Sequence, residues 1–590
     1  SNNFPIPLAE ELRTNYGNLF QHVAIASSKG EHLIAFDEKK FSSLGMFVEP
    51  EFTEAFTLKL IGGSFTSFKD PHTILVRESL ARALFGNQDA IGKTLLLDGT
   101  QSVKIAGVFE DLPLNAKFSD LSFFCPFSLL ISSNNNVKTL VNDWANSSFE
   151  IFVQATLGIS MEAISDRIKN VYWSKIESSR PKIAGYELTI FLHPMKDWHL
   201  RSNWKNGVQA GGRIQQVWLF GVIGLFVLSL ACINFMNLST ARSEKRAKEV
   251  GIRKAIGSMR GQLVKQFLSE SFLIVSLAFV ISLGVVSSSL SWFNELSSKE
   301  ISLPFAQPVF WMLSVPFILI TASLSGSYPA VYLSSFQPVK VLKGTFRAGN
   351  LAAMPRRIMV TLQFTVSIVL MVGTIVVYRQ VQHAQDRPVG YDKKGLIQIT
   401  MNTADLFGKY DVLQKELLES GGAIGFAQSS STTTQDNYFD DNFEWEGKDI
   451  SRHRMSFALV GVTYDFGKTI GWEFIQGRDF SRNFSTEGSS MILNEAAVRY
   501  MGLVDPIGKS IKWNNNTFTV IGVIKDVITG SPYEPALQSV YFLVNDVGPF
   551  ISIRLNPDLS MGNAIEKIEP IFKKYNPSSP FAYSFVDEEY

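Results

Sequence analysis

Two short segments come close to a phosphate-binding loop, the pattern that would give this chain chemistry of its own. GNQDAIGKT (residues 86–94) and GLVDPIGKS (residues 502–510) both end in Gly-Lys followed by a hydroxyl residue. A phosphate-binding loop has four residues between its glycines, because the loop must curl its N–H groups around the phosphates. Both segments have five, so we interpret each as a helix end followed by a turn into a strand. The sequence therefore predicts no ATPase in this chain, and any ATP-driven role needs a separate subunit.

The residues that could bind a metal or act as a nucleophile show no recognisable spacing. None of the seven histidines pairs with another at the i, i+4 spacing of a helical metal site, and neither Cys125 nor Cys232 is near one. No G-x-S-x-G motif occurs. We therefore predict no catalytic residue, no metal site and no cofactor. The net charge of +1 and a pI of about 7.7 give no indication of nucleic-acid binding.

The most strongly patterned segment is a basic loop at residues 242–271. It contains three acids and eight cations, the latter at positions 242, 245, 246, 248, 253, 254, 260 and 265. Apolar residues recur within it at helical spacing, and these are Ile252, Ala255, Ile256, Met259 and Leu263. The pattern predicts an amphipathic helix at the membrane surface. Pattern alone leaves open whether the helix docks a partner or whether the cations only orient the neighbouring spans.

Four uncharged runs are long enough to cross a bilayer, which takes roughly 20 apolar residues. They are residues 217–238, 272–293, 308–333 and 358–378. The loops at 242–271 and 334–357 are basic, whereas the loop at 294–307 is not. Because cytoplasmic loops carry the excess of Lys and Arg, we place both basic loops inside, and the segments before 213 and after 380 outside.

Polar and helix-breaking residues also stand in these spans. Asn234, Asn237 and Gln363 are expected to make interhelical hydrogen bonds. Pro329, in the cluster Gly326–Pro329, is expected to kink or end its helix near the inner face, because proline lacks a backbone donor.

The outer segments predict mixed α+β domains, and one repeats the other. Alternating apolar stretches at 32–38, 72–76 and 102–109 indicate strands, while 78–86 and 161–178 indicate helices. Residues 60–112 align with residues 474–527 at an offset that stays between 414 and 416. The glycine pairs 63 and 477, 92 and 508, and 107 and 522 all match. A duplicated domain explains this constancy.

Two segments carry a family resemblance. ACINFMNLSTARSEKRAKEVGIRKAIGS (231–258) and GSYPAVYLSSFQPVKVLKG (326–344) resemble the membrane domain of FtsX/MacB-like ABC transporter permeases, and the repeated outer domains resemble the MacB-like periplasmic core domain. The resemblance implies a membrane protein with α-helical transmembrane segments and two α+β extracytoplasmic domains. The expected domains are a first periplasmic copy (1–212), an FtsX-like membrane domain with three spans (213–345), a further span (346–380) and a second copy (381–590). The family's first span and second membrane half would lie outside this chain.

The resemblance also implies a function. We expect a multi-pass permease subunit in the cytoplasmic (inner) membrane, coupling ATP hydrolysis by a cytoplasmic ABC ATPase to movement of the periplasmic domains. That movement would export or extract a lipoprotein, peptide, toxin or drug. The expected partners are the ATPase, a periplasmic adaptor or substrate protein, and membrane lipid, but not nucleic acid. An alternative is an FtsX-like regulator of a cell-wall hydrolase that transports nothing.

The ATPase contacts of the family fall on the basic loop. The positions carried over are Glu249, Gly251, Arg253, Lys254, Ile256 and Gly257. Arg253 is the strongest single candidate, because its guanidinium can fork two hydrogen bonds to a partner. Gly251 interrupts a helical pattern, which suggests either a close approach by a partner backbone or a simple bend.

Overall fold

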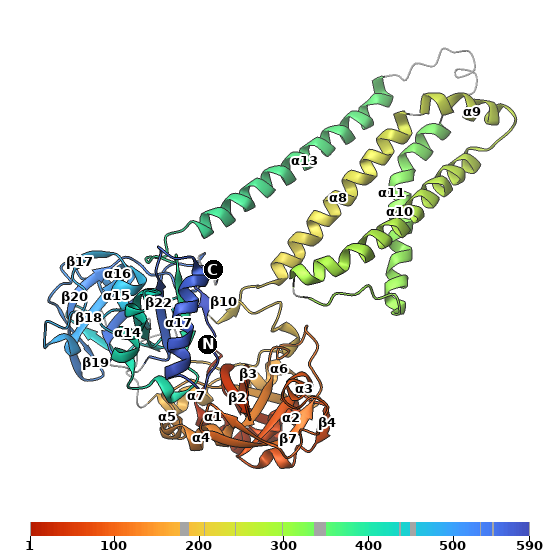
Figure 1. Cartoon of the computed structure of the whole chain (residues 1–590). Helices are drawn as coiled ribbons and strands as arrows, with labels where there is room; N and C mark the ends of the chain where they lie inside the picture. The colour runs from red at the N-terminus through yellow and green to blue at the C-terminus, as the bar shows by residue number, and fades with distance from the viewer. Residues whose placement is uncertain are drawn as a thin grey trace. The chain divides into compact units, whose positions relative to one another are not determined.

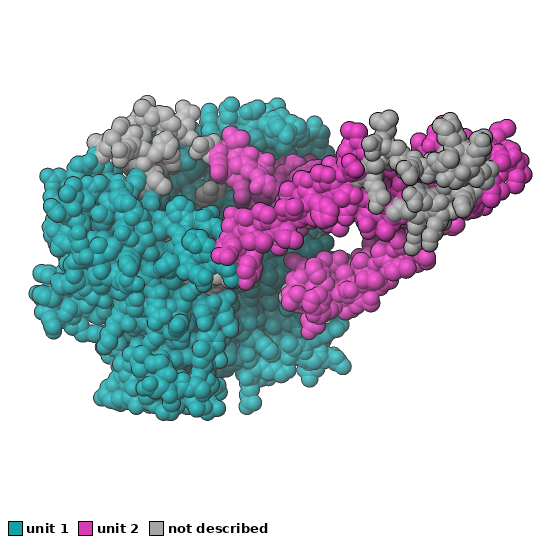
Figure 2. Space-filling model, turned by 90° about the horizontal axis from the view of Figure 1, so that it is seen from above, with its two compact units in different colours: residues 1–192, 382–590 teal, residues 193–381 magenta. Residues whose placement is uncertain are grey.

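The structure is a computed structural model, and its described residues divide into two units. One unit comprises residues 1–192 with 382–590, and the other comprises residues 193–381 (Figures 1 and 2). The described residues are 2–177, 188–205, 207–241, 243–297, 299–335, 350–435, 438–448, 456–530, 533–544 and 548–588. Part of the second family segment and most of the predicted basic loop at 334–357 therefore lie outside the described residues.

The first half of the larger unit is built on a mixed sheet. Its described strands run in the order β2-β6-β7-β5-β8-β3-β1-β9, with β4 beside β7. The strands are β1 (Phe20–Ala26), β2 (Gly30–Phe36), β3 (Lys39–Val48), β4 (Leu60–Gly63), β5 (Thr73–Arg77), β6 (Thr94–Leu97), β7 (Gln101–Phe109), β8 (Phe123–Pro126) and β9 (Glu150–Ala155). The helices are α1 (Ile6–Tyr16), α2 (Pro50–Ala55), α3 (Glu78–Phe85), α4 (Phe127–Ser133), α5 (Asn135–Leu140), α6 (Met161–Ile168) and α7 (Val171–Ile176).

The second half repeats this order. Its described strands run β15-β19-β20-β18-β21-β16-β13-β22-β12-β23, with β14 beside β16 and β17 beside β20. The strands are β12 (Leu396–Thr400), β13 (Ala423–Ser429), β14 (Phe439–Asp440), β15 (Phe443–Trp445), β16 (Phe457–Val462), β17 (Phe474–Gly477), β18 (Ser490–Asn494), β19 (Ser510–Trp513), β20 (Asn516–Ile524), β21 (Ser539–Leu543), β22 (Phe550–Leu555) and β23 (Ser584–Phe585). The helices are α14 (Tyr410–Glu419), α15 (Phe466–Ile470), α16 (Glu495–Met501) and α17 (Met561–Tyr575).

The two sheets agree in register as well as in order. β5 pairs in parallel with β7, and a bulge places Ile74 opposite Ile105 but Leu75 opposite Gly107. β18 and β20 repeat that arrangement, with a bulge between Met491 and Ile492. The strands that contain Ile105 and Val520 therefore occupy the same place in their sheets, as the repeat in the sequence predicts.

The glycines that align between the halves are explained by backbone geometry. Gly63 and Gly477 have φ of +89° and +77°. A Cβ at either position would lie 2.2 Å from a carbonyl oxygen, that of Ala106 or Ile521. Only glycine fits such a site, because both the positive φ and the missing space exclude a side chain.

One predicted helix is wrong in length. The continuous helix predicted at 161–178 is two helices, α6 and α7, separated at Lys169 and Asn170. The N–H of Ile190 donates to the Lys169 carbonyl at 3.0 Å, so a neighbouring segment takes a backbone acceptor at the break. Periodicity could not reveal this, because the competing donor comes from a segment twenty residues away.

The smaller unit holds the spans. Its elements are β10 (Trp204–Lys205), β11 (Val208–Gln209), α8 (Ile214–Ala241), α9 (Ser243–Ala255), α10 (Arg260–Ser297), α11 (Pro308–Ser334) and α13 (Asn350–Gln385) (Figure 1). Within the described residues, α8, α10, α11 and α13 are the four helices long and apolar enough to cross a membrane. Each contains one predicted span, so the four predicted spans are confirmed as helices.

Aromatic residues mark one end of every span. Trp218, Trp292, Trp311 and Tyr378 are all exposed, and each lies toward the end of its helix away from the basic loops. Exposed Trp and Tyr concentrate at membrane interfaces, where an apolar ring and a polar group are both satisfied. Such aromatic belts occur at both interfaces, so these residues mark helix ends and the orientation stays a prediction.

The Gly326–Pro329 cluster lies inside α11, so one of the two outcomes expected at Pro329, the end of the helix, is wrong. Neither Pro329 nor the cluster ends its helix, since α11 continues to Ser334. A Cβ at Gly326 would lie 2.6 Å from the Ser271 hydroxyl oxygen on α10, so glycine is required for close helix contact rather than for a terminus.

The expected interhelical hydrogen bonds are not seen. Among the described residues, the Oδ1 atom of Asn237 is buried without a hydrogen-bond partner, and Asn234 is exposed. Gln363 is half-buried on α13, where the described apolar side chains are largely exposed. These polar side chains therefore do not hold the described helices together.

Candidate functional site

The basic loop forms a helix, a tight turn and the start of the next helix. α9 ends at Ala255, and Gly257 adopts φ +104°. The Ser258 N–H donates to the Arg253 carbonyl at 3.0 Å, and the Gly257 N–H donates to the Lys254 carbonyl at 3.1 Å. This pair of bonds is a Schellman motif, which satisfies the last carbonyls of a helix and favours glycine at its left-handed position.

The turn corrects the prediction of one amphipathic helix running from Ile252 to Leu263. α10 begins at Arg260, and the Gln262 side chain accepts a hydrogen bond from the Met259 N–H at 3.0 Å, capping the new helix. Leu263 therefore belongs to α10 and is buried. The 3.6-residue period continued across the break by coincidence of spacing.

The buried face of α9 rests on the two helices that follow. Val250 packs in a cluster with Leu263, Phe267, Ala330 and Leu333, from α10 and α11. The adjacent Gly251 is also buried. Gly251 therefore lies on the face of α9 that is covered within the chain, and its contact with a partner stays a prediction.

Two cations join the loop to the inner end of α11. Lys254 Nζ donates to the Ser334 carbonyl at 2.5 Å, and Arg260 Nε donates to the Ser334 hydroxyl at 3.3 Å. The carbonyls at a helix C-terminus lack partners in their own helix and carry partial negative charge, which cations satisfy. Burial, reinforced by the nearby Arg260 charge, lowers the pKa of Lys254. We call these three residues the α11 clamp.

Arg253 is also engaged within the chain. Its guanidinium donates to Gln266 Oε1 at 2.6 Å and pairs with Glu249 at 2.7 Å. Gln266 in turn donates to Glu270 at 3.3 Å. These bonds tie α9 to α10, and they leave the Arg253 side chain 42% exposed.

Three apolar side chains of the loop are exposed. Ile252 is 49% exposed, Ile256 82% and Met259 73%. We call these three residues the apolar ridge. Exposed apolar residues gathered at one place mark interaction sites, because leaving them in water forgoes the hydrophobic gain of burial. Of the six residues predicted from the sequence, Ile256 lies on the ridge, Gly257 forms the turn beside it, and Arg253 and Lys254 hold the loop in place.

The loop-like segments that resemble phosphate-binding motifs have a structural role. Gly86 and Gly502 end α3 and α16 with φ of +63° and +70°. The N–H groups of Gly92 and Gly508 then bond to carbonyls of β7 and β20, at 2.9 and 2.8 Å. A phosphate-binding loop needs such N–H groups to point at the ligand. Here the N–H groups of both glycines are used to hold the turns to the sheet.

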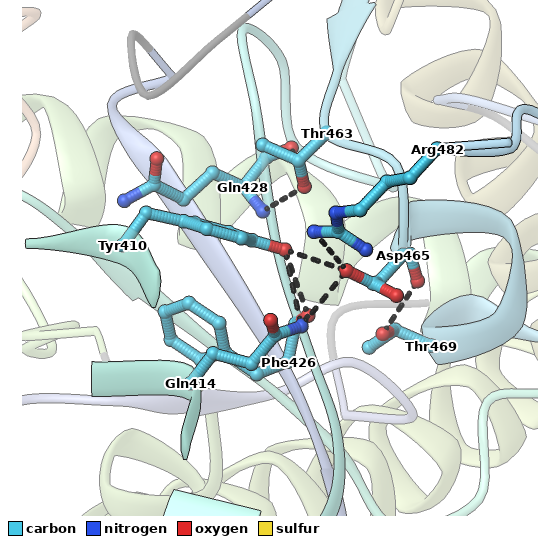
Figure 3. Close-up of polar contacts among 8 residues, drawn as sticks. All are labelled: Tyr410, Gln414, Phe426, Gln428, Thr463, Asp465, Thr469 and Arg482. Atoms are coloured by element: carbon cyan, nitrogen blue, oxygen red, sulfur yellow. Dashed lines mark hydrogen bonds and ion pairs between the residues drawn. The ribbon is translucent and has the colours of Figure 1, made fainter. Parts of the chain in front are cut away.

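A second polar cluster lies in the outer unit, between α14 and the end of β16. Asp465 accepts hydrogen bonds from Arg482 and Gln414, each at 2.9 Å, and from Tyr410 at 3.3 Å (Figure 3). Burial pushes the pKa of Asp465 upward, but the bonds from Arg482 and Gln414 outweigh it and hold the pKa below its ordinary value. Gln414 also donates to the Phe426 carbonyl at 3.3 Å.

The first half has a counterpart to this cluster. Arg13, on α1, donates to the Val23 carbonyl of β1 at 3.0 Å and pairs with Glu49, just after β3. Glu49 also accepts from the Ile25 N–H at 2.9 Å. Burial is the main influence on Glu49 and raises its pKa. Both clusters fasten a helix to a strand and an acid, and Arg13 and Glu49 also line a pocket of 520 Å³ beside α1.

Family models match most of the chain. The model described as "MacB-like periplasmic core domain" matches residues 1–171 and 359–571, which is more than half of the chain. The model described as "FtsX-like permease C-terminal" matches residues 221–339.

Curated relatives agree with those models. The chain is 21% identical to the uncharacterized ABC transporter permease YknZ of Bacillus subtilis over 274 residues, which are 46% of this chain and 61% of that protein. It is 24% identical to the macrolide export ATP-binding/permease protein MacB of Aggregatibacter actinomycetemcomitans over 42% of this chain and 35% of that protein. The chain thus spans less than two thirds of the length of either relative.

Two crystal structures of outer domains also align. The periplasmic region of MacB from Actinobacillus actinomycetemcomitans is 16% identical, with a TM-score of 0.23 over 30% of this chain and 83% of that one. The extracellular domain of the ABC-type transporter YknZ is 17% identical, with a TM-score of 0.24 over 32% of this chain and 90% of that one. Neither overlay bears on function.

Proposed function

This chain belongs to the FtsX/MacB-like family of ABC transporter permeases, and we propose that it transmits ATP-driven movement from a cytoplasmic ATPase to its outer domains. It is a multi-pass membrane protein with extracytoplasmic α+β domains. Membership of the family implies a cytoplasmic ATPase as partner. The proposal adds where that ATPase docks and how its movement enters the membrane.

The observation that carries the proposal is the apolar ridge on a rigidly held turn. Ile252, Ile256 and Met259 are exposed, although the same loop buries Val250 and Leu263 efficiently. A partner that covered the ridge would gain the burial that the chain itself leaves unused. Cations around an apolar centre are the usual anatomy of a docking site, where the centre supplies affinity and the charged rim supplies orientation.

The α11 clamp supports a route for the movement. Ser334 is fully buried, and its carbonyl and hydroxyl are both held by cations of the docking loop. Arg253 fastens the same loop to α10. A displacement of the turn would therefore be carried directly by α10 and α11, because packed helices move as rigid bodies rather than deforming.

The cargo is proposed at the level of class. We propose export or extraction of a lipoprotein, peptide, toxin or drug from the outer face of the cytoplasmic membrane, in concert with a periplasmic adaptor or substrate protein. The proposal is supported by the duplicated outer domains, which are the parts that such a mechanism would move. Catalysis of ATP hydrolysis is assigned to the partner and not to this chain.

The test is isolation of the full chain from its native membrane in mild detergent. We expect an ABC ATPase to co-isolate, and its ATP hydrolysis to change when the full chain is added back to the separated ATPase. Repeated isolation of the intact chain with no ATPase, together with no effect on hydrolysis by any ABC ATPase of the same cell, would refute the proposal.

A further inference from the structure

The second outer half has one strand whose outer edge is only partly covered. β12 pairs with β22 along its whole length, from Leu396 opposite Arg554 to Thr400 opposite Phe550. On its other edge, β23 pairs only with Ile397 and Gln398. Among the described residues, no strand continues that pairing past Gln398.

The direction of the uncovered backbone groups follows from the ladder. The Met401 N–H donates to the Pro549 carbonyl on the β22 side, and the Leu396 carbonyl accepts from the Val586 N–H on the β23 side. Backbone groups alternate sides along a strand, so Thr400 and Asn402 present theirs to the β23 side. That edge is therefore a template for one more strand.

A groove lies along this open edge. Its volume is 290 Å³, close to the lower end of the range for ligand pockets. β12 contributes Gln398, Thr400 and Asn402 to its lining, and an aromatic wall is formed by Phe572, Phe581 and Tyr583. Glu31 and Ser42 of the first half also line the groove. Successive rings on that wall are in contact, at 5.2 Å from Phe572 to Phe581 and 5.3 Å from Phe581 to Tyr583.

Gln398 adds an unsatisfied polar group to the groove. The residue is 4% exposed, and neither its amide nitrogen nor its amide oxygen has a hydrogen-bond partner among the described residues. A buried primary amide without partners is costly, and a group with both a donor and an acceptor would satisfy it. A peptide unit is such a group.

We propose that this groove binds an extended polypeptide segment, which adds as a strand to the open edge of β12. The backbone of Thr400 supplies the main-chain hydrogen bonds, Gln398 pairs with a peptide unit, and the aromatic wall receives alternate side chains. A saccharide would use the aromatic wall and the amide but not the strand edge, so the uncovered backbone favours a peptide. The groove is separate from the docking loop, and the proposal does not depend on an ATPase.

The experiment uses the full chain in lipid nanodiscs and a displayed library of random heptapeptides. Peptides selected on the wild-type chain are then measured by fluorescence anisotropy against three variants. Thr400→Pro removes the N–H on the open edge while leaving the β22 ladder intact. Thr400→Val keeps that N–H and removes only the hydroxyl, so it is the matched control. Gln398→Met removes the amide at similar volume.

We expect Thr400→Pro to weaken binding at least tenfold, Gln398→Met to weaken it several-fold, and Thr400→Val to leave it unchanged. Two further peptides carry N-methyl groups at odd-numbered or at even-numbered residues. Only one of them should lose binding, because only alternate N–H groups of the peptide face β12. Thermal unfolding of each variant, matched to the wild type, shows that the fold survives. Selection of no peptide, or equal binding of selected peptides to the wild type and Thr400→Pro, overturns the proposal.

Discussion

The apolar ridge makes a quantitative prediction about Ile256. Its side chain is 82% exposed, so nearly all of its apolar surface is available to a partner. Fully burying an isoleucine contributes about 1.5–3 kcal/mol, and four fifths of that is about 1.2–2.4 kcal/mol. Truncation in Ile256→Ala should therefore weaken ATPase binding by roughly 8- to 50-fold, at about 1.4 kcal/mol per factor of ten. Ile256→Glu should weaken it further, because a charge would be buried without a partner.

The assay is the affinity of the purified ATPase for the full chain in nanodiscs, measured by surface plasmon resonance. Lys265→Gln is the matched control, since it also changes the charge by one negative unit at an exposed position of the same loop. It lies outside the ridge and should change affinity less than twofold. Because Ile256 follows the last residue of α9 and contacts no buried cluster, the fold should be unaffected. If Ile256→Glu binds the ATPase as tightly as Lys265→Gln does, the ridge is not the docking surface.

Three further outcomes are expected. Arg253→Glu should abolish stimulated ATP hydrolysis while leaving membrane insertion intact, because it repels Glu249 and releases the loop from α10; unchanged hydrolysis would mean that the loop only orients the spans. A cysteine at Ser297 should react with an impermeant maleimide in intact cells, whereas one at Ser258 should react only after permeabilisation, and the reverse pattern would invert the topology. Burial raises the pKa of Asp479 from 3.8 to about 6. The protonated carboxyl therefore stabilises the folded state fully below about pH 3.8, and this stabilisation is lost as the pH rises through 6. The thermal midpoint of Asp479→Asn, minus that of the wild type, should accordingly increase between pH 4.5 and 7, and a constant difference would contradict the raised pKa.

The spans and the repeat were predictable because each depends on a local rule. An uncharged run longer than twenty residues almost always forms a membrane helix. The four such runs lie in α8, α10, α11 and α13. The aligned glycines could be recognised because a positive φ beside a carbonyl admits no other residue, as at Gly63 and Gly477. Such constraints are visible in one sequence.

The details of the docking loop were less predictable because they depend on distant partners. The sequence pattern places Ile252, Ile256 and Leu263 on one face, but the turn at Gly257 separates Leu263 from the other two. Which of them is buried depends on α11, whose residues lie some eighty positions away. Arg253 was predicted as a partner contact from its chemistry, and its bonds to Glu249 and Gln266 add a role within the chain that spacing does not reveal. The open edge of β12 could not be predicted for the same reason, because it depends on how far β23, almost two hundred residues away, pairs with β12.

The two acid clusters of the outer unit show how the duplicated halves hold equivalent helices. Glu49 follows β3 and holds α1, whereas Asp465 follows the equivalent strand β16 and holds α14. The pKa of Glu49 is raised and that of Asp465 is lowered. What the two halves share is the placement of the helix, through donation from Arg13 or Gln414 to a strand carbonyl. The duplicated halves therefore hold equivalent helices with different side chains, so the placement of the helix is retained where the residues that hold it are not.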